Sequence, residues 1–143
     1  MSSAPSAAPA TFTDITSAAG IRFRHYNGLT GDYLYPEIVG SGAALFDFDN
    51  DGDLDLFLVQ GTTLRPSDDA AKTLTPWTGA QPPSGRLYRN DLAPGSARLT
   101  FTDVTAASGI EARGYGMGVA AGDVDNDGRV DLPSPTLAPT SCG

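Results

Sequence analysis

The chain has 143 residues, a formal net charge of −8 and one cysteine. This length favours a single domain, and the lone Cys142 excludes a framework of internal disulfide bonds. Lys and Arg total nine and form no basic stripe, so no nucleic-acid surface is expected. No apolar run approaches the roughly 20 residues of a membrane-spanning helix, so no membrane span is expected.

Residues 1–10 are rich in Ser, Ala and Pro and are expected to form a disordered tail. They have neither the basic start nor the apolar stretch of a signal peptide, so the sequence shows no recognisable export signal.

The segment Phe12–Ile21 returns almost intact as Phe101–Ile110. We predict that residues 11–42 contain the outer strand of a preceding sheet, at Phe12–Thr16, followed by an inserted hairpin. Apolar and polar residues alternate in Ile21–Tyr26, and the Asn-Gly pair that follows is a strong turn signal. The hairpin is expected to end near Tyr33–Tyr35. His25 lies on its first strand, where a structural role is favoured over that of a ligand or a general base.

The segment Asp47–Asp55 has aspartate at positions 1, 3, 5, 7 and 9 and glycine at position 6. Short apolar runs on both sides, Ala43–Phe46 and Leu56–Val59, predict two strands of a hairpin. The loop recurs at Asp123–Asp131, with arginine at position 7. Together the two loops hold more than half of the acidic residues of the chain.

Calcium binds six to eight oxygen ligands. A nine-residue loop can supply side-chain oxygens from positions 1, 3, 5 and 9 and a backbone carbonyl from position 7. The glycine at position 6 is expected to turn the chain with a positive φ. We therefore predict two calcium sites, with these residues as ligands: Asp47, Asp49, Asp51, Asp55 and the carbonyl of Asp53 in the first, and Asp123, Asp125, Asp127, Asp131 and the carbonyl of Arg129 in the second.

The sequence disfavours three alternatives for these loops. An EF-hand needs a glutamate at position 12 and flanking helices, whereas position 12 is Leu58 in the first copy and Ser134 in the second. A solvated acidic turn needs one or two aspartates, and four at alternating positions would repel one another without a cation. Magnesium demands near-ideal octahedral geometry and keeps its waters, so this many protein oxygens favour calcium.

Residues 43–105 are predicted to form one complete four-stranded antiparallel sheet. Its third and fourth strands are expected at Arg86–Asn90 and Leu99–Val104, after an exposed loop at 62–85. Trp77 in this loop is expected to pack on the sheet rather than to bind a ligand. Residues 106–132 then begin a second sheet through the second loop. Pro133 and Pro135 cannot continue a central strand, so 133–143 is expected to be a Pro-rich tail in which the second sheet is cut short.

The wording of these motifs resembles FG-GAP/VCBS repeat proteins, most of all the branch with cartilage acidic protein and bacterial ASPIC/UnbV-type proteins. The resemblance rests on GSGAALFDFDNDGDLDLFLVQG, RLYRND, FTDVTAASGI and GYGMGVAAGDVDNDG, and covers about residues 11 to 132. It implies an all-β fold of propeller blades, with a calcium loop between the first two strands of each blade, as in integrin α-subunits. A propeller has four to eight blades, so the chain is expected to be an incomplete propeller, a fragment of a longer protein.

The resemblance also implies a secreted, periplasmic or surface location and a role in adhesion or binding. We therefore expect a non-enzymatic, calcium-binding module whose parent propeller binds a protein or a carbohydrate. Candidate contact residues are Trp77, Tyr88 and Tyr115, although core packing explains the two tyrosines equally well. The alternative is an accessory part of a secreted metal-dependent lyase or hydrolase. It is disfavoured because one histidine and one late cysteine offer no catalytic arrangement.

Overall fold

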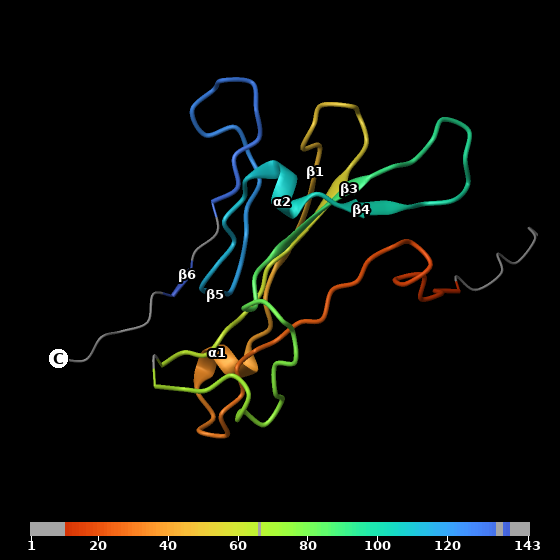
Figure 1. The fold of residues 1–143 in the computed structure, drawn as a ribbon. Coiled ribbons are helices and arrows are strands. Elements are labelled where there is room, and N and C mark those ends of the chain that lie inside the picture. Colours follow the sequence, from red (N-terminus) through yellow and green to blue (C-terminus); the bar gives the residue numbers. More distant parts are fainter. Residues whose placement is uncertain (1–10, 66, 134–135, 138–143) are drawn as a thin grey trace, which may run out of the picture.

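The computed structural model describes residues 11–65, 67–133 and 136–137. Two short helices accompany six short strands in these residues (Figure 1). The elements, in chain order, are α1 (Tyr35–Ile38), β1 (Ala43–Phe46), β2 (Asp55–Leu58), β3 (Arg86–Asn90), β4 (Phe101–Asp103), α2 (Thr105–Ser108), β5 (Tyr115–Gly116) and β6 (Thr136–Leu137).

The main sheet is four-stranded and antiparallel, in the order β1-β2-β3-β4. Its first hairpin pairs Phe46 with Asp55, on either side of the first acidic loop. Strand β3 joins β2 after the long loop, and β4 pairs with β3 through Arg89 and Thr102. The predicted strand order is confirmed, and the third strand has the predicted bounds.

The core lies against one face of this sheet. Its buried residues, contributed by β1, β2, β3 and the end of the first hairpin, are Phe46, Phe57, Val59 and Leu87. Side chains of a β-strand alternate between its two faces, which is why Phe57 and Val59 are buried together. Val119 and Leu132, from the second hairpin, pack against the same cluster. The second hairpin is therefore fixed on the sheet by apolar contacts.

The second hairpin repeats the pairing of the first around its loop. Gly122 and Asp131 form an antiparallel bridge at the positions that correspond to Phe46 and Asp55. The prediction that pairing stops before Pro133 is wrong: its carbonyl accepts a bond from Ala120 N at 3.3 Å. Proline lacks only the N–H, so it is compatible with an edge strand.

Further along this hairpin, β5 and β6 form a second, two-stranded sheet. Backbone pairing in the second hairpin thus extends beyond 132, to β6 at 136–137. Most of the predicted tail, like the tail predicted at 1–10, lies outside the described residues. The domain limits stay a prediction.

The repeated segments Phe12–Ile21 and Phe101–Ile110 share a turn near their ends. Ala19 N donates to Ile15 O at 2.7 Å, and the corresponding Ser108 N donates to Val104 O at 2.8 Å. Each turn ends at a glycine with positive φ, 87° in the first copy and 73° in the second. The repetition seen in the sequence is thus also a repetition of local structure.

The strand predicted at Phe12–Thr16 is not formed. Phe12 is 96% exposed, and no strand among the described residues lies beside it. A β-strand needs a neighbour to pair its backbone groups. The predicted neighbour belonged to a preceding sheet.

The hairpin predicted between Ile21 and Tyr35 is also absent, and α1 follows instead. The backbone of this segment is held by one side chain. Tyr26 N donates to Gln60 Oε1 at 2.7 Å, and Gln60 Nε2 donates to Arg24 O at 3.0 Å. A buried amide side chain thus replaces the partner strand that the alternating pattern suggested.

The two irregular segments, 22–42 and 62–85, pack against each other at one end of the molecule, around α1 (Figure 1). Leu74 N donates to Leu29 O at 2.8 Å. The ring centroids of Tyr26 and Trp77 lie 5.7 Å apart, and the Tyr26 hydroxyl bonds to Thr73 Oγ1 at 3.2 Å. Trp77 therefore packs on Tyr26 rather than on the sheet. The loop predicted to be exposed at 62–85 is in part packed against the segment 22–42.

Tyr115 connects this end of the molecule to β5. It is 3% exposed, and the single proton of its hydroxyl is shared between the carbonyl oxygens of Asn27 and Pro36, at 2.9 and 2.7 Å. Burial, reinforced by the nearby charge of Glu37, raises the pKa of Tyr115 to about 12.

The pKa of Tyr115 predicts a loss of stability in alkaline solution. Its pKa exceeds the ordinary value of 10.0, so the folded state holds the phenolic proton more tightly than the unfolded state. The stability from this proton is complete below pH 10 and is lost as pH rises towards about 12. Urea unfolding across this range should show wild type losing more stability than Tyr115→Phe. Parallel curves for the two proteins would contradict the assignment.

Candidate metal centre

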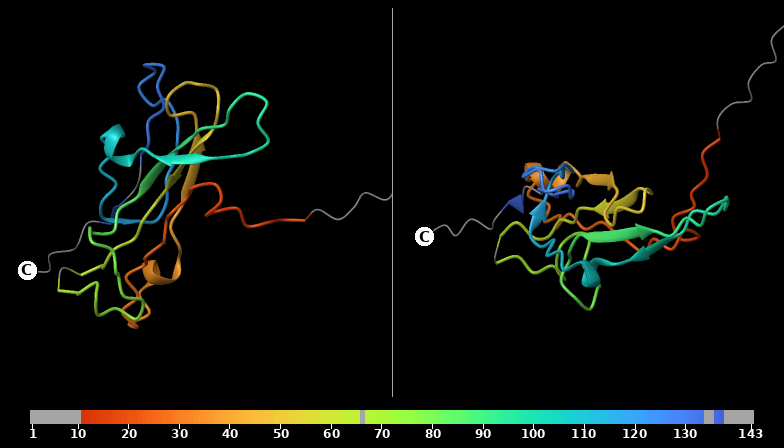
Figure 2. Two further views of the ribbon diagram at one scale, coloured as in Figure 1. Left: turned by 45° about the vertical axis from the view of Figure 1, so that its right-hand side comes forward. Right: turned by 90° about the horizontal axis from the view of Figure 1, so that it is seen from above.

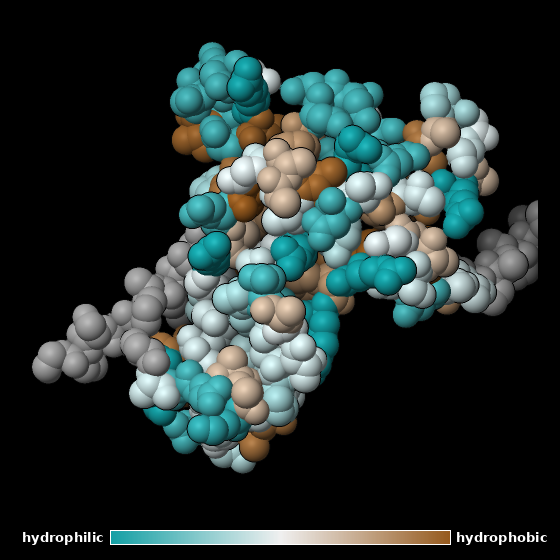
Figure 3. Space-filling model, viewed as in Figure 1, coloured by the Kyte–Doolittle hydropathy of each residue, from teal (hydrophilic) through white to brown (hydrophobic). Residues whose placement is uncertain are grey.

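The two acidic loops project from the same end of the molecule. In Figures 1 and 2, the loop between β1 and β2 and the loop between β5 and β6 extend beyond the sheets, opposite α1. In the space-filling view the tips of this end are mainly hydrophilic, with hydrophobic patches beside them (Figure 3). Both loops are thus placed by antiparallel pairing at their bases, Phe46 with Asp55 and Gly122 with Asp131.

The loops share one hydrogen-bond pattern. In the first, Asp47 Oδ1 accepts a bond from Asp51 N at 3.1 Å, and Asp47 Oδ2 accepts one from Gly52 N at 3.0 Å. The carboxylate at position 1 therefore holds the turn closed. The second loop repeats both bonds, at 3.1 and 2.9 Å, with the corresponding residues Asp123, Asp127 and Gly128.

The backbone conformation is repeated as well. Gly52 and Gly128 have φ values of 92° and 85°, which confirms the prediction of positive φ at position 6. Asn50 and Asn126 also have positive φ, 59° and 61°. Asparagine and glycine adopt this left-handed conformation more readily than other residues. The Asn-Asp-Gly sequence can therefore have positive φ at its first and third residues.

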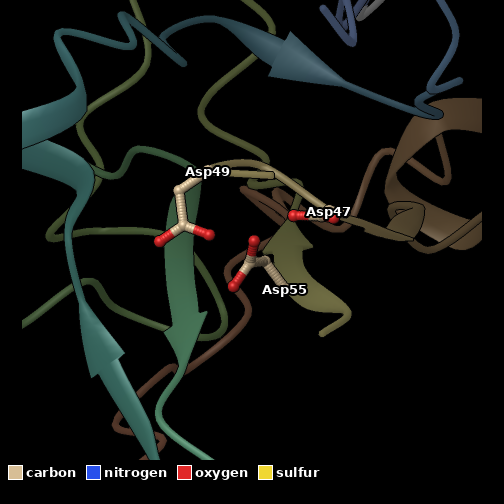
Figure 4. Close-up of side chains that lie close together, drawn as sticks. All are labelled: Asp47, Asp49 and Asp55. Carbon is tan, nitrogen blue, oxygen red and sulfur yellow. The ribbon is translucent and has the colours of Figure 1, made fainter. Parts of the chain in front are cut away.

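In each loop the turn brings three carboxylates together. Figure 4 shows the carboxylates of Asp47, Asp49 and Asp55 gathered around a common space. One oxygen from each lies within 4.8 Å of the others. Oxygens on opposite sides of a calcium ion are separated by about 4.6–5.2 Å, twice the usual Ca–O distance, so the three fit one calcium ion. The second loop also gathers three carboxylates, but from positions 1, 3 and 5 rather than 1, 3 and 9: Asp123, Asp125 and Asp127.

The groups differ in one member from the predicted ligand sets. Asp51 is outside the first group, and its Oδ1 accepts a bond from Asp53 N at 2.9 Å. Asp131 is outside the second group, and its Oδ2 accepts a bond from Val124 N at 2.9 Å. Among the described residues, each loop thus assembles three of its four predicted side chains. The two remaining side chains and the carbonyls of Asp53 and Arg129 stay predictions.

Asp55 is the buried member of the first group, with 0% of its surface exposed. Its two oxygens accept bonds from Phe48 N at 2.6 Å and from Asn90 N at 2.7 Å. The Asn90 side chain in turn donates to Leu54 O at 3.2 Å. Strand β3 therefore braces the first loop through Asn90. The sequence does not predict this contact: Asn90 belongs to the RLYRND motif, but the motif does not indicate which residue it contacts.

The gathered charges affect protonation in the first loop. The pKa of Asp49 is raised, first by desolvation and then by the negative charges of Asp51 and Asp55, while the Arg89 guanidinium opposes the shift. Neighbouring negative charges disfavour the ionised form of a carboxylate, and a nearby positive charge favours it. The carboxylates of the first loop therefore repel one another.

The other residues considered from the sequence lie elsewhere. His25 belongs to neither acidic group, and desolvation lowers its pKa. Tyr88 and Tyr115 are buried. Of the two roles considered for them, ligand contact and core packing, the structure shows core packing. Trp77 is half-buried and donates through Nε1 to Gln81 O at 2.8 Å.

Comparison with known families agrees with this geometry. The model of the FG-GAP-like repeat matches residues 47–132, from the first aspartate of one loop to the residue after the last aspartate of the other. The match covers more than half of the chain. This chain belongs to the FG-GAP-like repeat family. No curated protein and no solved structure matches it.

Membership of the FG-GAP family agrees with the observed fold. The structure is all-β in architecture, and its four-stranded antiparallel sheet with a loop between the first two strands is a propeller blade. The described residues comprise this blade and the first hairpin of another, so they do not close a ring. No helix among them has the length and apolar character needed to traverse a membrane.

Proposed function

We propose that this FG-GAP repeat module binds two calcium ions, one in each acidic loop. The observation that carries the proposal is the duplicated loop geometry, with three carboxylate oxygens within 4.8 Å of one another in each copy. A hard cation with oxygen ligands suits such a group.

In this proposal calcium stabilises the fold rather than performing chemistry. The ion offsets the repulsion among Asp47, Asp49 and Asp55 and ties the tip of the loop to its base. Any ligand that binds only the folded state stabilises it, by about 2.7 kcal/mol when its concentration is 100 times Kd. The first loop should bind more tightly than the second, because Asp55 is buried and braced by Asn90.

The wider role that we propose is adhesion or binding in a secreted, periplasmic or cell-surface propeller. Its partner would be a protein or a carbohydrate. Both loops lie at one end of the molecule. The irregular segments around α1, at the other end, are therefore free for such contacts (Figure 1).

The alternative function is an accessory part of a metal-dependent lyase or hydrolase. A metal held by aspartates can activate water, but a partnering base is needed. Neither acidic group includes a histidine or cysteine among the described residues. Hydrolysis that survives purification and disappears in Asp47→Ala would favour this alternative.

Loop-specific substitutions test the calcium proposal. Asp47→Asn and Asp123→Asn keep the side-chain volume but remove one charge from each group, so each should abolish one of two binding events in calorimetric titration. The affinity of the intact loop should change little. The assignment would be wrong if both variants still bound two ions with the wild-type affinities. The Asp51→Ala variant then tests whether this side chain is a ligand: unchanged binding would remove it from the set.

A further inference from the structure

A pocket on the side of the blade is lined by two arginines and lies apart from the two acidic loops. It has a volume of about 220 Å³. This is smaller than the pockets that hold drug-sized ligands, which are about 300–1,000 Å³. Its lining residues come from the end of the long loop, β3 and the segment before β5, and are Gln81, Pro82, Pro83, Ser84, Arg86 and Arg113.

The backbone brings the two arginines together from distant parts of the chain. Gly85 N donates to Ala112 O at 2.9 Å, and each of these residues directly precedes one of the arginines. The contact is close because Gly85 has no side chain: a Cβ there would lie 2.8 Å from Ala112 Cβ and 3.0 Å from Leu58 O. Arg86 and Arg113 are therefore held at one pocket by the fixed meeting of two segments.

These guanidinium groups are poorly neutralised. Arg86 Nε lies 3.8 Å from Asp103 Oδ2, near the limit of an ion pair. Arg113 is exposed and forms no ion pair within the part of the chain that the structure describes. Arg86 thus has one carboxylate at the edge of ion-pair distance, and the unpaired positive charge at the pocket is that of Arg113. The planar guanidinium group binds carboxylates in a bidentate manner, so an oxyanion would compensate this charge.

The rest of the lining indicates which oxyanion. Pro82 supplies exposed apolar surface, while Ser84 and Gln81 supply a hydroxyl and an amide. The Gln81 carbonyl is fixed by the bond from Trp77 Nε1. We propose that this pocket binds an acidic sugar of the size of one uronic acid. Its carboxylate would contact Arg113 and Arg86, its hydroxyl groups would contact the polar side chains, and one face of its ring would contact Pro82.

The test is a calorimetric titration of the whole chain with glucuronate, in saturating calcium and again after chelation. We expect saturable binding of glucuronate and none of glucose, with acetate weaker by tenfold or more. Arg113→Ala should weaken glucuronate binding at least tenfold, and Arg113→Lys should lose less because it keeps the charge. Arg98→Ala, which removes an exposed arginine from another loop, is the matched control and should bind as wild type.

Three results would overturn the proposal. One is the absence of glucuronate binding in a chain whose thermal melt shows that it is folded. Another is equal affinity for acetate and glucuronate, which would show that the sugar contributes nothing. The last is an unchanged affinity in Arg113→Ala. The pocket shares no residue with the two acidic loops, so failure of calcium binding leaves this test intact as long as the chain is folded.

Discussion

Asp55→Ala is expected to lower the free energy of unfolding of the calcium-free protein by about 2–5 kcal/mol. Asp55 is fully buried, and its carboxylate accepts bonds from the backbone N–H groups of Phe48 and Asn90. Alanine would leave both donors without a partner, and each unsatisfied buried group costs about 1–3 kcal/mol. Urea unfolding of chelator-treated wild type and variant measures this loss. Calcium binding to the first loop should be lost as well.

Asp131→Ala is the matched control, because it removes the corresponding carboxylate of the second loop. Among the described residues, the Asp131 carboxylate accepts one backbone bond, from Val124 N at an exposed site, where water can replace it. The loss of stability should therefore stay below about 1 kcal/mol. Equal losses in the two variants would show that strand β3 does not brace the first loop.

Gly28→Ala is expected to destabilise the protein by about 2–4 kcal/mol. A Cβ at Gly28 would lie 2.2 Å from Thr62 O, and the residue has a φ of +62°. The substitution therefore adds a clash with backbone, where no flexible side chain can move away, to the cost of a left-handed conformation. Because Gly28 lies where the two irregular segments meet, the contact of Trp77 with Tyr26 should be disturbed, and the fluorescence of Trp77 should change as well. Thermal and urea unfolding measure the loss.

Gly95→Ala separates the two contributions. Gly95 has a similar φ of +77°, but a Cβ there would meet nothing within 4 Å. This variant should therefore lose only the conformational part, about 1 kcal/mol. If Gly28→Ala lost no more free energy of unfolding than Gly95→Ala, the close contact between Gly28 and Thr62 would be contradicted.

The main sheet could be predicted from the sequence because its signals are local. Ala43–Phe46 and Leu56–Val59 are short apolar runs on either side of an Asn-Asp-Gly turn, and this pattern determines a hairpin without further information. Strand β3 has the predicted bounds, Arg86–Asn90. The repeat of the acidic loop likewise predicted the positive φ of Gly52 and Gly128.

The irregular segments could not be predicted in the same way. Ile21–Tyr26 alternates like a strand, yet its backbone bonds go to the side chain of Gln60. That interaction joins residues far apart in the sequence, and alternation alone does not identify the partner. The same limit applies to Trp77, whose contact with Tyr26 exists only once both segments are folded.

The acidic loops were predicted in position but only partly in their ligand sets. Spacing predicted Asp47, Asp49, Asp51 and Asp55 as side-chain ligands of one site, and the structure places oxygens of the first, second and fourth together. Spacing does not reveal which side chain lies outside the group, because Asp51 and its counterpart Asp127 accept the same loop bond while only Asp127 belongs to a group. Pro133 predicts the end of a strand because proline lacks an N–H. Its carbonyl can still accept a bond at a sheet edge, as it does from Ala120 N.

Calorimetric titration of chelator-treated protein with calcium tests the central claim most directly. We predict two binding events, the tighter one from the first loop, together with a melting temperature that rises with calcium concentration. Absence of binding in a protein that circular dichroism shows to be folded would contradict the claim, and the two acidic loops would then be ordinary turns.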